Sequence, residues 1–394
     1  MKSTRAIALV ANTRLPSERA QALQVVQSAS AFARRGHATT IYYARRRERV
    51  ELPAGTTLFQ HYAVAPGVHP GLREVPCIDW IDALPRALQF WPARLQEWSF
   101  SRNAARSVSR ECAGALVLSR EIECARELVR DPRRDVFLEV HRVPGGATRR
   151  AWLLELAGAV RGLIAISGGV RDDLVALGLQ RESITVEHDG FEAARFAAPI
   201  TREAARRCLA LDPHAPLVVY TGGLLDWKGV DELVDAARLI PEAQFVVAGG
   251  LADDVARLRS RADGLANVRI DGFQPPERVA VYLAAGDLGV VPNRSRPAIA
   301  ARYTSPLKVF EAMAAGLPLV ASDVPALREL LTDGVDAWLA PPDDAAGLAA
   351  VLRAALADAS GRVARAQRFR ARAPEHTWDA RATRILDWME TRLR

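Results

Sequence analysis

One stretch constrains the fold more than any other part of the chain: residues 303–323, YTSPLKVFEAMAAGLPLVASD. It reads as a short helix that passes directly into a buried strand. Ser305 is a favourable N-cap residue, and Pro306 suits the first helical position, where a missing N–H costs nothing. Gly316 ends the helix, and Pro318 prevents it from restarting. The stretch therefore predicts one helix–strand unit of a larger sheet.

The start of this helix carries unusual chemistry. The N–H groups that follow Ser305 have no intrahelical acceptors, and together with the positive end of the helix dipole they favour an anion. Lys308 adds a full charge in the first turn, and Glu311 lies on roughly the same face. A phosphate-sized anion site beside a carboxylate suited to a sugar diol indicates a nucleotide sugar. The alternative is that Ser305 and Pro306 form only a cap, and that Lys308 and Glu311 form an ordinary surface pair.

The rest of the chain alternates between apolar strands and amphipathic helices, which is typical of an α/β fold with doubly wound parallel sheets. We expect first-half strands at 6–11, near Leu58, and at 115–118, 136–140, 162–166 and 184–187, with a further strand at 38–43. We expect second-half strands at 216–220, 244–248, 267–270, 288–291, 318–321 and 337–340. The pattern predicts an N-terminal Rossmann-like domain over 1–192 and a second over 193–374, facing each other across a cleft. The final helix, within 375–394, is expected to cross back to the first domain.

Composition narrows the function classes. The chain has 394 residues, 49% of them hydrophobic, and a net charge of +7, which permits an anionic partner without specifying one. Its four cysteines show no C-x-x-C spacing, so we expect no disulfide framework, no metal site and no cofactor, in a reducing cytoplasm. The first apolar run, 6–11, is too short for a signal peptide, and no run approaches the roughly 20 residues that span a bilayer. We therefore expect a cytoplasmic protein that is at most peripheral at the inner face of the membrane.

The segment 86–102 interleaves aromatic residues with arginines. Such a surface can lie on a membrane interface. The sequence slightly favours the ordinary alternative, in which helices pack the aromatic side chains inward and show the arginines to water. Pro92 interrupts the helical pattern here.

Two further glycine-rich turns of the second half suit phosphate. Gly222-Gly223 and Gly249-Gly250 follow expected strands, and Lys228-Gly229 precedes a helix. Glycines let backbone N–H groups approach a phosphate, and lysine supplies charge. Only three lysines occur, Lys2, Lys228 and Lys308, against 50 arginines, so the two internal lysines are informative. The alternative for Lys228 is an exposed loop lysine.

At this point the chain resembles a known family. The segments YTGGLLDWKGVDEL (220–233), VVAGG (246–250), GFQ (272–274) and SPLKVFEAMAAGLPLVASD (305–323) resemble the donor half of retaining glycosyltransferases of the GT-B architecture, in the large group 1 family of the family 4 type. In the first half LPSERA (15–20), ARRGH (33–37), EVH (139–141), ISGGVR (166–171) and HDGFE (188–192) stand in the family's order. The likeness covers nearly the whole chain, and 305–323 is its most specific part.

The resemblance implies roles for individual residues. Glu311 matches the glutamate that holds the donor ribose, Lys228 the lysine on the donor diphosphate, and His141 a first-domain histidine near the donor sugar, so these three form the implied catalytic set. The implied donor-binding residues also include Gly222, Gly223, Gly249, Gly250, Phe273, Ser305, Pro306, Leu307 and Lys308. Ser17, Glu18 and Arg19 are expected on the acceptor side. The alternative for His141 is a strand-end histidine bonded to backbone.

Two positions depart from the family's pattern. Tyr303 stands where the first glutamate of a pair is expected, and Gly223 where an arginine usually accompanies the lysine. The missing arginine leaves one positive charge fewer, which Lys308 or a nearby arginine such as Arg302 can replace. A subset of the family carries Ser-Pro-Leu-Lys here, so neither departure indicates an inactive protein.

Family membership implies transfer of a sugar from a nucleoside-diphosphate sugar to an acceptor hydroxyl, with retention of configuration and without a divalent metal. The base, the sugar and the acceptor stay open, the last among envelope glycans, glycolipids or other lipid-linked acceptors and secondary metabolites. A nucleotide-sugar epimerase or a phosphorylase on the same fold is an alternative. A non-catalytic anion- or nucleic-acid-binding protein is a weaker one, because no helix-turn-helix, RNP or zinc pattern accompanies the charge.

Overall fold

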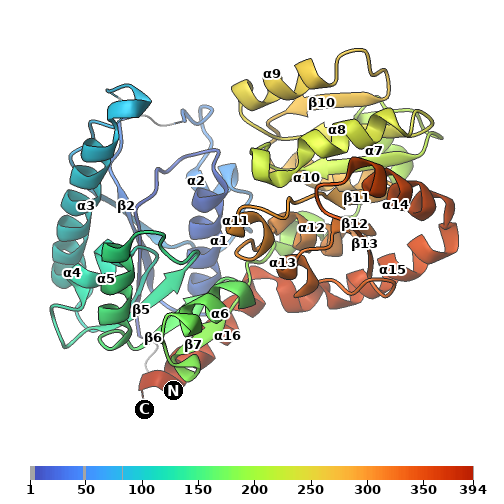
Figure 1. Ribbon diagram of the computed structural model, residues 1–394. Coiled ribbons are helices and arrows are strands. Elements are labelled where there is room, and N and C mark those ends of the chain that lie inside the picture. The colour runs from blue at the N-terminus through green and yellow to red at the C-terminus, as the bar shows by residue number, and fades with distance from the viewer. Residues whose placement is uncertain (1–4, 48–49, 82, 394) are drawn as a thin grey trace. The chain divides into compact units, whose positions relative to one another are not determined.

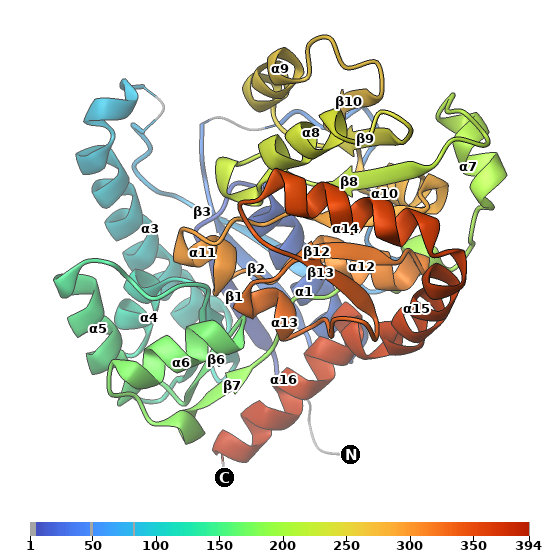
Figure 2. The ribbon, with the colours of Figure 1, turned by 45° about the vertical axis from the view of Figure 1, so that its right-hand side comes forward.

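The computed structural model describes residues 5–47, 50–81 and 83–393, and the chain divides into two compact units (Figures 1 and 2). The first unit extends to His188 and takes up the chain again at Trp378, and the second comprises Asp189–Thr377. The boundaries predicted from the sequence, after residue 192 and at residue 375, lie within a few residues of these points. Lys2 lies outside the described residues.

The first unit is built on a seven-stranded parallel sheet in the order β3-β2-β1-β4-β5-β6-β7. Its strands are β1 (Ile7–Ala11), β2 (Thr39–Ala44), β3 (Gly71–Val75), β4 (Leu116–Ser119), β5 (Asp135–Val140), β6 (Gly162–Ala165) and β7 (Ile184–Val186). The chain adds β2 and β3 on one side of β1 and then returns to add β4 on the other. Its connections therefore change direction between β1 and β4, the point at which doubly wound sheets bind ligands beyond the carboxyl ends of their strands.

Helices cover both faces of this sheet (Figure 1). α3, α4 and α5 pack side by side on one face, while α1 and α16 pack against each other on the opposite face. The helices are α1 (Ala20–Arg34), α2 (Leu58–His61), α3 (Phe90–Glu111), α4 (Ile122–Leu128), α5 (Ala147–Ala157), α6 (Gly168–Ala176) and α16 (Trp378–Leu393). Arg381 anchors α16: its guanidinium is buried and donates to Glu139 of β5, to Ser28 of α1 and to the His188 carbonyl. The final helix thus returns to the first unit, as the sequence predicted.

The second unit has a six-stranded parallel sheet in the order β10-β9-β8-β11-β12-β13. Its strands are β8 (Leu217–Thr221), β9 (Gln244–Ala248), β10 (Val268–Gly272), β11 (Leu288–Val291), β12 (Leu319–Ser322) and β13 (Ala337–Ala340). Its helices are α7 (Arg202–Cys208), α8 (Val230–Arg238), α9 (Ala252–Arg261), α10 (Pro276–Ala285), α11 (Ala298–Ala301), α12 (Leu307–Ala315), α13 (Pro325–Arg328), α14 (Ala345–Ala357) and α15 (Ala359–Arg372). The central strands are fully buried and mostly apolar, as is typical of parallel strands covered on both faces. The change of direction falls between β8 and β11.

The segment between β2 and β4 differs most from the sequence prediction. The expected strand near Leu58 is wrong, because Thr57 and Gln60 form a capping box that begins the short helix α2. The edge strand β3 was not predicted, since its exposed residues show no apolar pattern. Pro92 does not interrupt α3, because it lies in the first turn, where its missing N–H would have no intrahelical acceptor.

The aromatic side chains of α3 also contradict the expectation of inward packing. Phe90, Trp91 and Trp98 are exposed, whereas Phe100 is buried. Of the described helices, none is both long enough and apolar enough to cross a membrane.

Candidate functional site

The second unit gathers the predicted donor-binding residues where its sheet changes direction. Gly222 and Gly223 follow β8, Gly249 and Gly250 follow β9, and Phe273 follows β10. Because all strands are parallel, these turns lie at the same edge of the sheet. Phe273 presents an exposed ring there, with 40% of its surface accessible.

Two glycines bring the β8 and β9 turns into direct backbone contact. A Cβ on Gly249 would lie 2.2 Å from the carbonyl oxygen of Gly222, and the φ angle of Gly249 is +131°. The N–H of Gly249 donates to the carbonyl of Gly272 (2.6 Å), and that of Gly222 to the carbonyl of Ala248 (2.9 Å). Only glycine fits at position 249, so no side chain from this position covers the backbone at this edge of the sheet. Gly223 has open space around it, since a Cβ there would meet nothing within 4 Å.

Lys308 is the most unusual residue of the site. It is 8% exposed, and its Nζ has no hydrogen-bond partner among the described residues. The ammonium lies over the ring of Tyr220, 3.7 Å from its centroid, and a Cβ on Gly222 would lie 3.5 Å from Cε of Lys308. Burial and then the charge of Lys228 lower the pKa of Lys308 well below its ordinary value, and Glu311 opposes this only in part. A buried cation without an acceptor costs free energy that a bound anion would recover.

Lys228 stands at the end of a short 3-10 turn, Asp226–Lys228, before α8. It is half-buried rather than an exposed loop lysine, and its Nζ lies 3.9 Å from the centroid of the Trp227 ring. Burial lowers the pKa of Lys228 to about 8. Burial lowers the pKa of both lysines, and the charge of Lys228 lowers that of Lys308 further, so the two ammonium groups form an electropositive site.

Glu311 is paired, and its partner is Arg195 rather than Lys308. Nη1 of Arg195 donates to Oε1 of Glu311 (2.7 Å), and the two side chains are 5% and 13% exposed. Nη2 of Arg195 also donates to the carbonyl of Pro276 (2.5 Å), which fixes the guanidinium between α12 and the start of α10. The suggested surface pair of Lys308 and Glu311 is therefore wrong. Glu311 is a fixed, largely buried carboxylate.

The start of α12 differs from the predicted cap. The helix begins at Leu307, with Pro306 as its N-cap, and Ser305 makes no capping hydrogen bond. The hydroxyl oxygen of Ser305 instead accepts the N–H of Asp189 (2.7 Å). The first N–H groups of the helix, at Leu307 and Lys308, have no intrahelical acceptor, as at the start of every α-helix. The helix end keeps its anion-binding character without the serine cap.

His141 follows β5 in the first unit and belongs to a network of side chains, not of backbone groups. Its Nε2 lies 2.6 Å from Oε1 of Glu139 and 2.6 Å from Nη2 of Arg120. Arg381 donates to the other oxygen of Glu139 at 2.9 Å. Burial, reinforced by Arg120, lowers the pKa of His141 to about 4, so the imidazole is neutral at physiological pH.

The carboxylate of Glu139 holds this network together. Burial alone would raise its pKa, but the charges of Arg381 and Arg120 outweigh that effect and hold the pKa well below the ordinary value. Arg120 also donates to Oε1 of Gln24 in α1 (3.1 Å), so it connects the start of that helix to His141. The imidazole therefore lies at the carboxyl end of β5, and Arg120 links it to α1, the helix that comes after the loop following β1.

The three predicted acceptor-side residues occupy that loop. Ser17 is buried, its backbone exchanges hydrogen bonds with the hydroxyl of Tyr62, and its side chain accepts the N–H of Arg19. Glu18 and Arg19 are exposed. Ser17 thus fixes the loop, while its two neighbours face solvent.

Sequence reasoning missed three side chains that hold the site together. Arg195 lies in a short 3-10 turn, Ala193–Phe196, just after the predicted domain boundary, and no local signal marks it. Tyr220 was predicted only as the end of a strand, and Arg120 was not singled out. Each acts through a partner distant in sequence, which periodicity does not reveal. No group of three or more histidine, cysteine or acidic residues among the described residues is arranged to hold a metal ion.

Comparisons with known proteins agree with this geometry. Residues 215–358 match the family model described as glycosyl transferases group 1. The chain is 31% identical over 198 residues to the amylovoran biosynthesis glycosyltransferase AmsK of Erwinia amylovora, covering 48% of this chain and 46% of that protein. It is 32% identical over 247 residues to a D-inositol 3-phosphate glycosyltransferase of Xylanimonas cellulosilytica, covering 59% of this chain and 57% of that protein. These matches span about half the length of each relative.

The fold has close relatives among solved structures. The structure of Anabaena Alr3699/HepE in complex with UDP and glucose superposes with a TM-score of 0.75 at 18% identity, over 98% of this chain and 100% of that one. With two Rossmann-like units on parallel sheets, the chain has the GT-B architecture. Residues 215–358 match the glycosyl transferases group 1 family, and over this segment the chain is similar to members of that family.

Proposed function

We propose that the protein is a retaining hexosyltransferase that moves a sugar from a nucleoside-diphosphate sugar to an acceptor hydroxyl. The observation that carries the proposal is Lys308, a buried ammonium without a hydrogen-bond acceptor among the described residues, beside Gly222 and the start of α12. A diphosphate is the ligand that would supply the missing acceptors. The family match and the relatives named as glycosyltransferases support the same reaction class.

The donor's parts would be held by different elements. Lys308, Lys228 and the first N–H groups of α12, at Leu307 and Lys308, would bind the diphosphate oxygens. Glu311, already oriented by Arg195, would accept hydrogen bonds from the ribose hydroxyls. The backbone at Gly222 and Gly249 lets the diphosphate approach closely, and Phe273 offers an exposed ring near the base.

The same positive groups would serve the chemistry. Negative charge grows on the leaving diphosphate as the bond to the anomeric carbon breaks, and preorganised cations stabilise that charge more in the transition state than in the ground state. The sugar passes through an oxocarbenium-like state. No carboxylate of the site is placed as a nucleophile in this proposal, so retention would follow from attack on the same face, with a departing phosphate oxygen taking the acceptor proton. The lysines supply the charge, and the proposal needs no divalent metal or cofactor.

The first unit would contribute the acceptor side and one contact to the donor sugar. His141 is neutral at physiological pH, and Glu139 and Arg120 fix its ring, so it is suited to a hydrogen bond with a sugar hydroxyl. Glu18 and Arg19 would meet the acceptor. The acceptor would be an envelope glycan, a glycolipid or a secondary metabolite, and the relatives named for amylovoran biosynthesis and for D-inositol 3-phosphate suggest the first acceptors to test. The solved relative with UDP and glucose makes UDP-glucose the first donor to test.

Isothermal titration with UDP, GDP, ADP and a short DNA duplex tests the binding step. We expect one nucleoside diphosphate to bind and the duplex not to. Glu311→Ala should weaken nucleoside diphosphate binding more than Tyr303→Phe does, and the reverse order would mean that the ribose contact is misassigned. If no nucleoside diphosphate bound, the proposed function would be wrong.

A product assay with a panel of nucleotide sugars and candidate acceptors tests the reaction. Proton NMR of the product then reads the anomeric configuration, and inversion would refute same-face attack. His141→Ala should lower kcat/KM for the donor. An unchanged kcat/KM would remove His141 from the site.

A further inference from the structure

The exposed apolar side chains of the first unit are concentrated in one region. Of the sixteen large apolar side chains that are exposed in the described chain, nine lie between residues 68 and 98. Five of them lie between residues 80 and 98 and are at least half exposed, and we call these the aromatic patch: Trp80 (52%), Leu88 (60%), Phe90 (60%), Trp91 (76%) and Trp98 (51%). Single exposed apolar residues are ordinary, but a concentration of them in one short stretch of the chain indicates an interaction surface.

Helix α3 buries several polar side chains and exposes most of its aromatic ones, the reverse of the usual pattern. Its buried side carries Gln96, Ser99 and Ser101 beside small residues and Phe100, while Trp91 and Trp98 face solvent. A helix that existed only to complete the core would place its tryptophans inward. The outward aromatic side chains therefore contribute to something other than folding of the unit.

Arginines accompany the aromatic side chains along the same exposed stripe. The guanidinium of Arg94 lies 5.4 Å from the centroid of the Phe90 ring, and that of Arg102 lies 5.1 Å from the centroid of Trp98. Arg94 is paired with Glu97 at 2.7 Å, but Arg102 and Arg106 have no acidic partner among the described residues. The stripe thus presents two arginine charges that no carboxylate offsets, directly beside exposed tryptophan.

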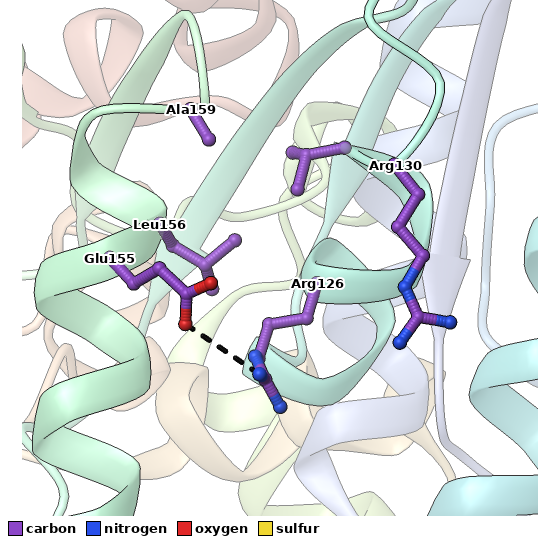
Figure 3. Close-up of a pocket in the computed structure, with 6 residues that line it drawn as sticks. Arg126, Arg130, Glu155, Leu156 and Ala159 are labelled. Atoms are coloured by element: carbon purple, nitrogen blue, oxygen red, sulfur yellow. Dashed lines mark ion pairs between the residues drawn. The ribbon is translucent and has the colours of Figure 1, made fainter.

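Arg102 and Arg106 also line a groove between α3 and α4, of about 330 Å³. The other two arginines of the groove are paired, Arg130 with Glu127 at 2.6 Å and Arg134 with Asp131 at 3.6 Å, so its excess positive charge comes from Arg102 and Arg106. Arg130 also borders a neighbouring hollow, where Arg126 reaches from α4 toward Glu155 and Leu156 of α5 (Figure 3). Because α3, α4 and α5 share one face of the sheet, the aromatic patch and the basic groove belong to a single surface (Figure 1).

We propose that this surface docks on an anionic lipid bilayer. Tryptophan side chains favour the boundary between headgroups and acyl chains, and arginines beside them bind anionic headgroups. The bases of a nucleic acid could stack on the aromatic rings but would make no favourable contact with exposed aliphatic residues such as Val68 and Leu88. Lipid acyl chains would contact both kinds of side chain. Docking of this kind requires no nucleotide and no membrane-spanning helix, so it does not depend on the proposed function.

Co-flotation of the full chain with vesicles tests the proposal. We expect binding to vesicles of phosphatidylcholine and phosphatidylglycerol in a 70:30 ratio, and binding at least tenfold weaker to phosphatidylcholine alone. The double variant Trp91→Ser and Trp98→Ser should bind anionic vesicles at least tenfold more weakly. Arg102→Ser with Arg106→Ser should reduce binding to the level seen on neutral vesicles, as should 0.5 M salt.

A matched control removes exposed apolar side chains elsewhere. Leu239→Ser with Val363→Ser alters residues that are 48% and 59% exposed in the second unit, and vesicle binding should change less than twofold. Far-ultraviolet circular dichroism and titration with a nucleoside diphosphate check that each variant is folded. Failure of the wild-type protein to float with anionic vesicles, or equal flotation of the tryptophan variant, would overturn the proposal. Displacement from vesicles by a 20-nucleotide single strand, with tight binding to that strand, would assign the surface to nucleic acid instead.

Discussion

Replacing Lys308 with methionine should stabilise the free protein and impair its binding of nucleoside diphosphates. The ammonium is buried over Tyr220 and has no acceptor among the described residues. Desolvating an ion costs several kcal/mol in a protein, and a desolvated ammonium over an aromatic ring regains about 2 kcal/mol. Methionine fills a similar volume without either effect. We therefore expect the free energy of unfolding to rise by about 1–3 kcal/mol.

The loss of binding follows from the hydrogen bonds that the lysine would make to phosphate. A hydrogen bond to a charged group contributes about 1.5–3 kcal/mol, so the dissociation constant should rise roughly 10- to 150-fold. A variant that is more stable when free and binds its ligand more weakly is the signature of a residue retained for function. A purely structural lysine would show the opposite change in stability.

Thermal unfolding with and without the bound nucleoside diphosphate measures both effects. A gain of about 2 kcal/mol raises Tm by roughly 4–8 °C in a domain of this size. A saturating ligand should reverse the order, because it stabilises the wild-type protein more than the variant. Lys228→Met is the matched control: Lys228 is half-buried, so its removal should weaken binding with a smaller gain in stability. If Lys308→Met unfolded more easily and kept its affinity within twofold, the reasoning about this site would be refuted.

Three further results are expected. Affinity for the nucleoside diphosphate should fall as pH rises above about 8, the pKa of Lys228 in the free protein. The bound anion raises that pKa, so above pH 8 the complex holds a proton that the free protein has lost. Calorimetric titration in buffers of different ionisation enthalpy should therefore show proton uptake on binding. Glu139→Gln should lower the free energy of unfolding by about 3–5 kcal/mol, because Arg381 and Arg120 lose their buried carboxylate, and a urea titration measures this. Chelation with EDTA should leave the initial transfer rate within twofold, since lysines and helix N–H groups supply the positive charge, and loss of activity restored by Mg²⁺ would contradict that account.

The fold was predictable because its elements are locally marked. Apolar runs such as those of β8 and β12 identify strands that are buried on both faces, and Ser167 and Gly36 mark helix ends. The region between β2 and β4 was not predictable to the same degree. There the edge strand β3 is exposed and polar, and α3 reverses the usual burial pattern, so hydrophobic periodicity gives the wrong face.

The candidate site was predictable in its glycines and lysines but not in its contacts. Gly222, Gly249 and Lys308 were identified because turn chemistry and charge are visible in a single sequence. An ordinary surface pair of Lys308 and Glu311 was the alternative to the anion site, because a three-residue spacing brings side chains near each other on a helix. In the folded chain Glu311 pairs with Arg195 instead. The guanidinium of Arg195 donates to Glu311 through one nitrogen, and its other nitrogen is held by the carbonyl of Pro276.

That partner changes how the donor site is understood. Arg195 reaches Glu311 from 116 positions earlier in the chain, and at 5% exposure it is inaccessible to solvent for most of its surface. Oε1 of Glu311 is engaged by Arg195, which leaves Oε2 as the acceptor for a ribose hydroxyl. The carboxylate is therefore oriented before any ligand arrives, and little conformational entropy remains to be lost on binding. Glu311 is thus engaged by Arg195, while Nζ of Lys308 has no hydrogen-bond partner among the described residues. A single buried arginine thereby separates the two proposed functions of α12, with the ammonium left for phosphate and the carboxylate for sugar hydroxyls.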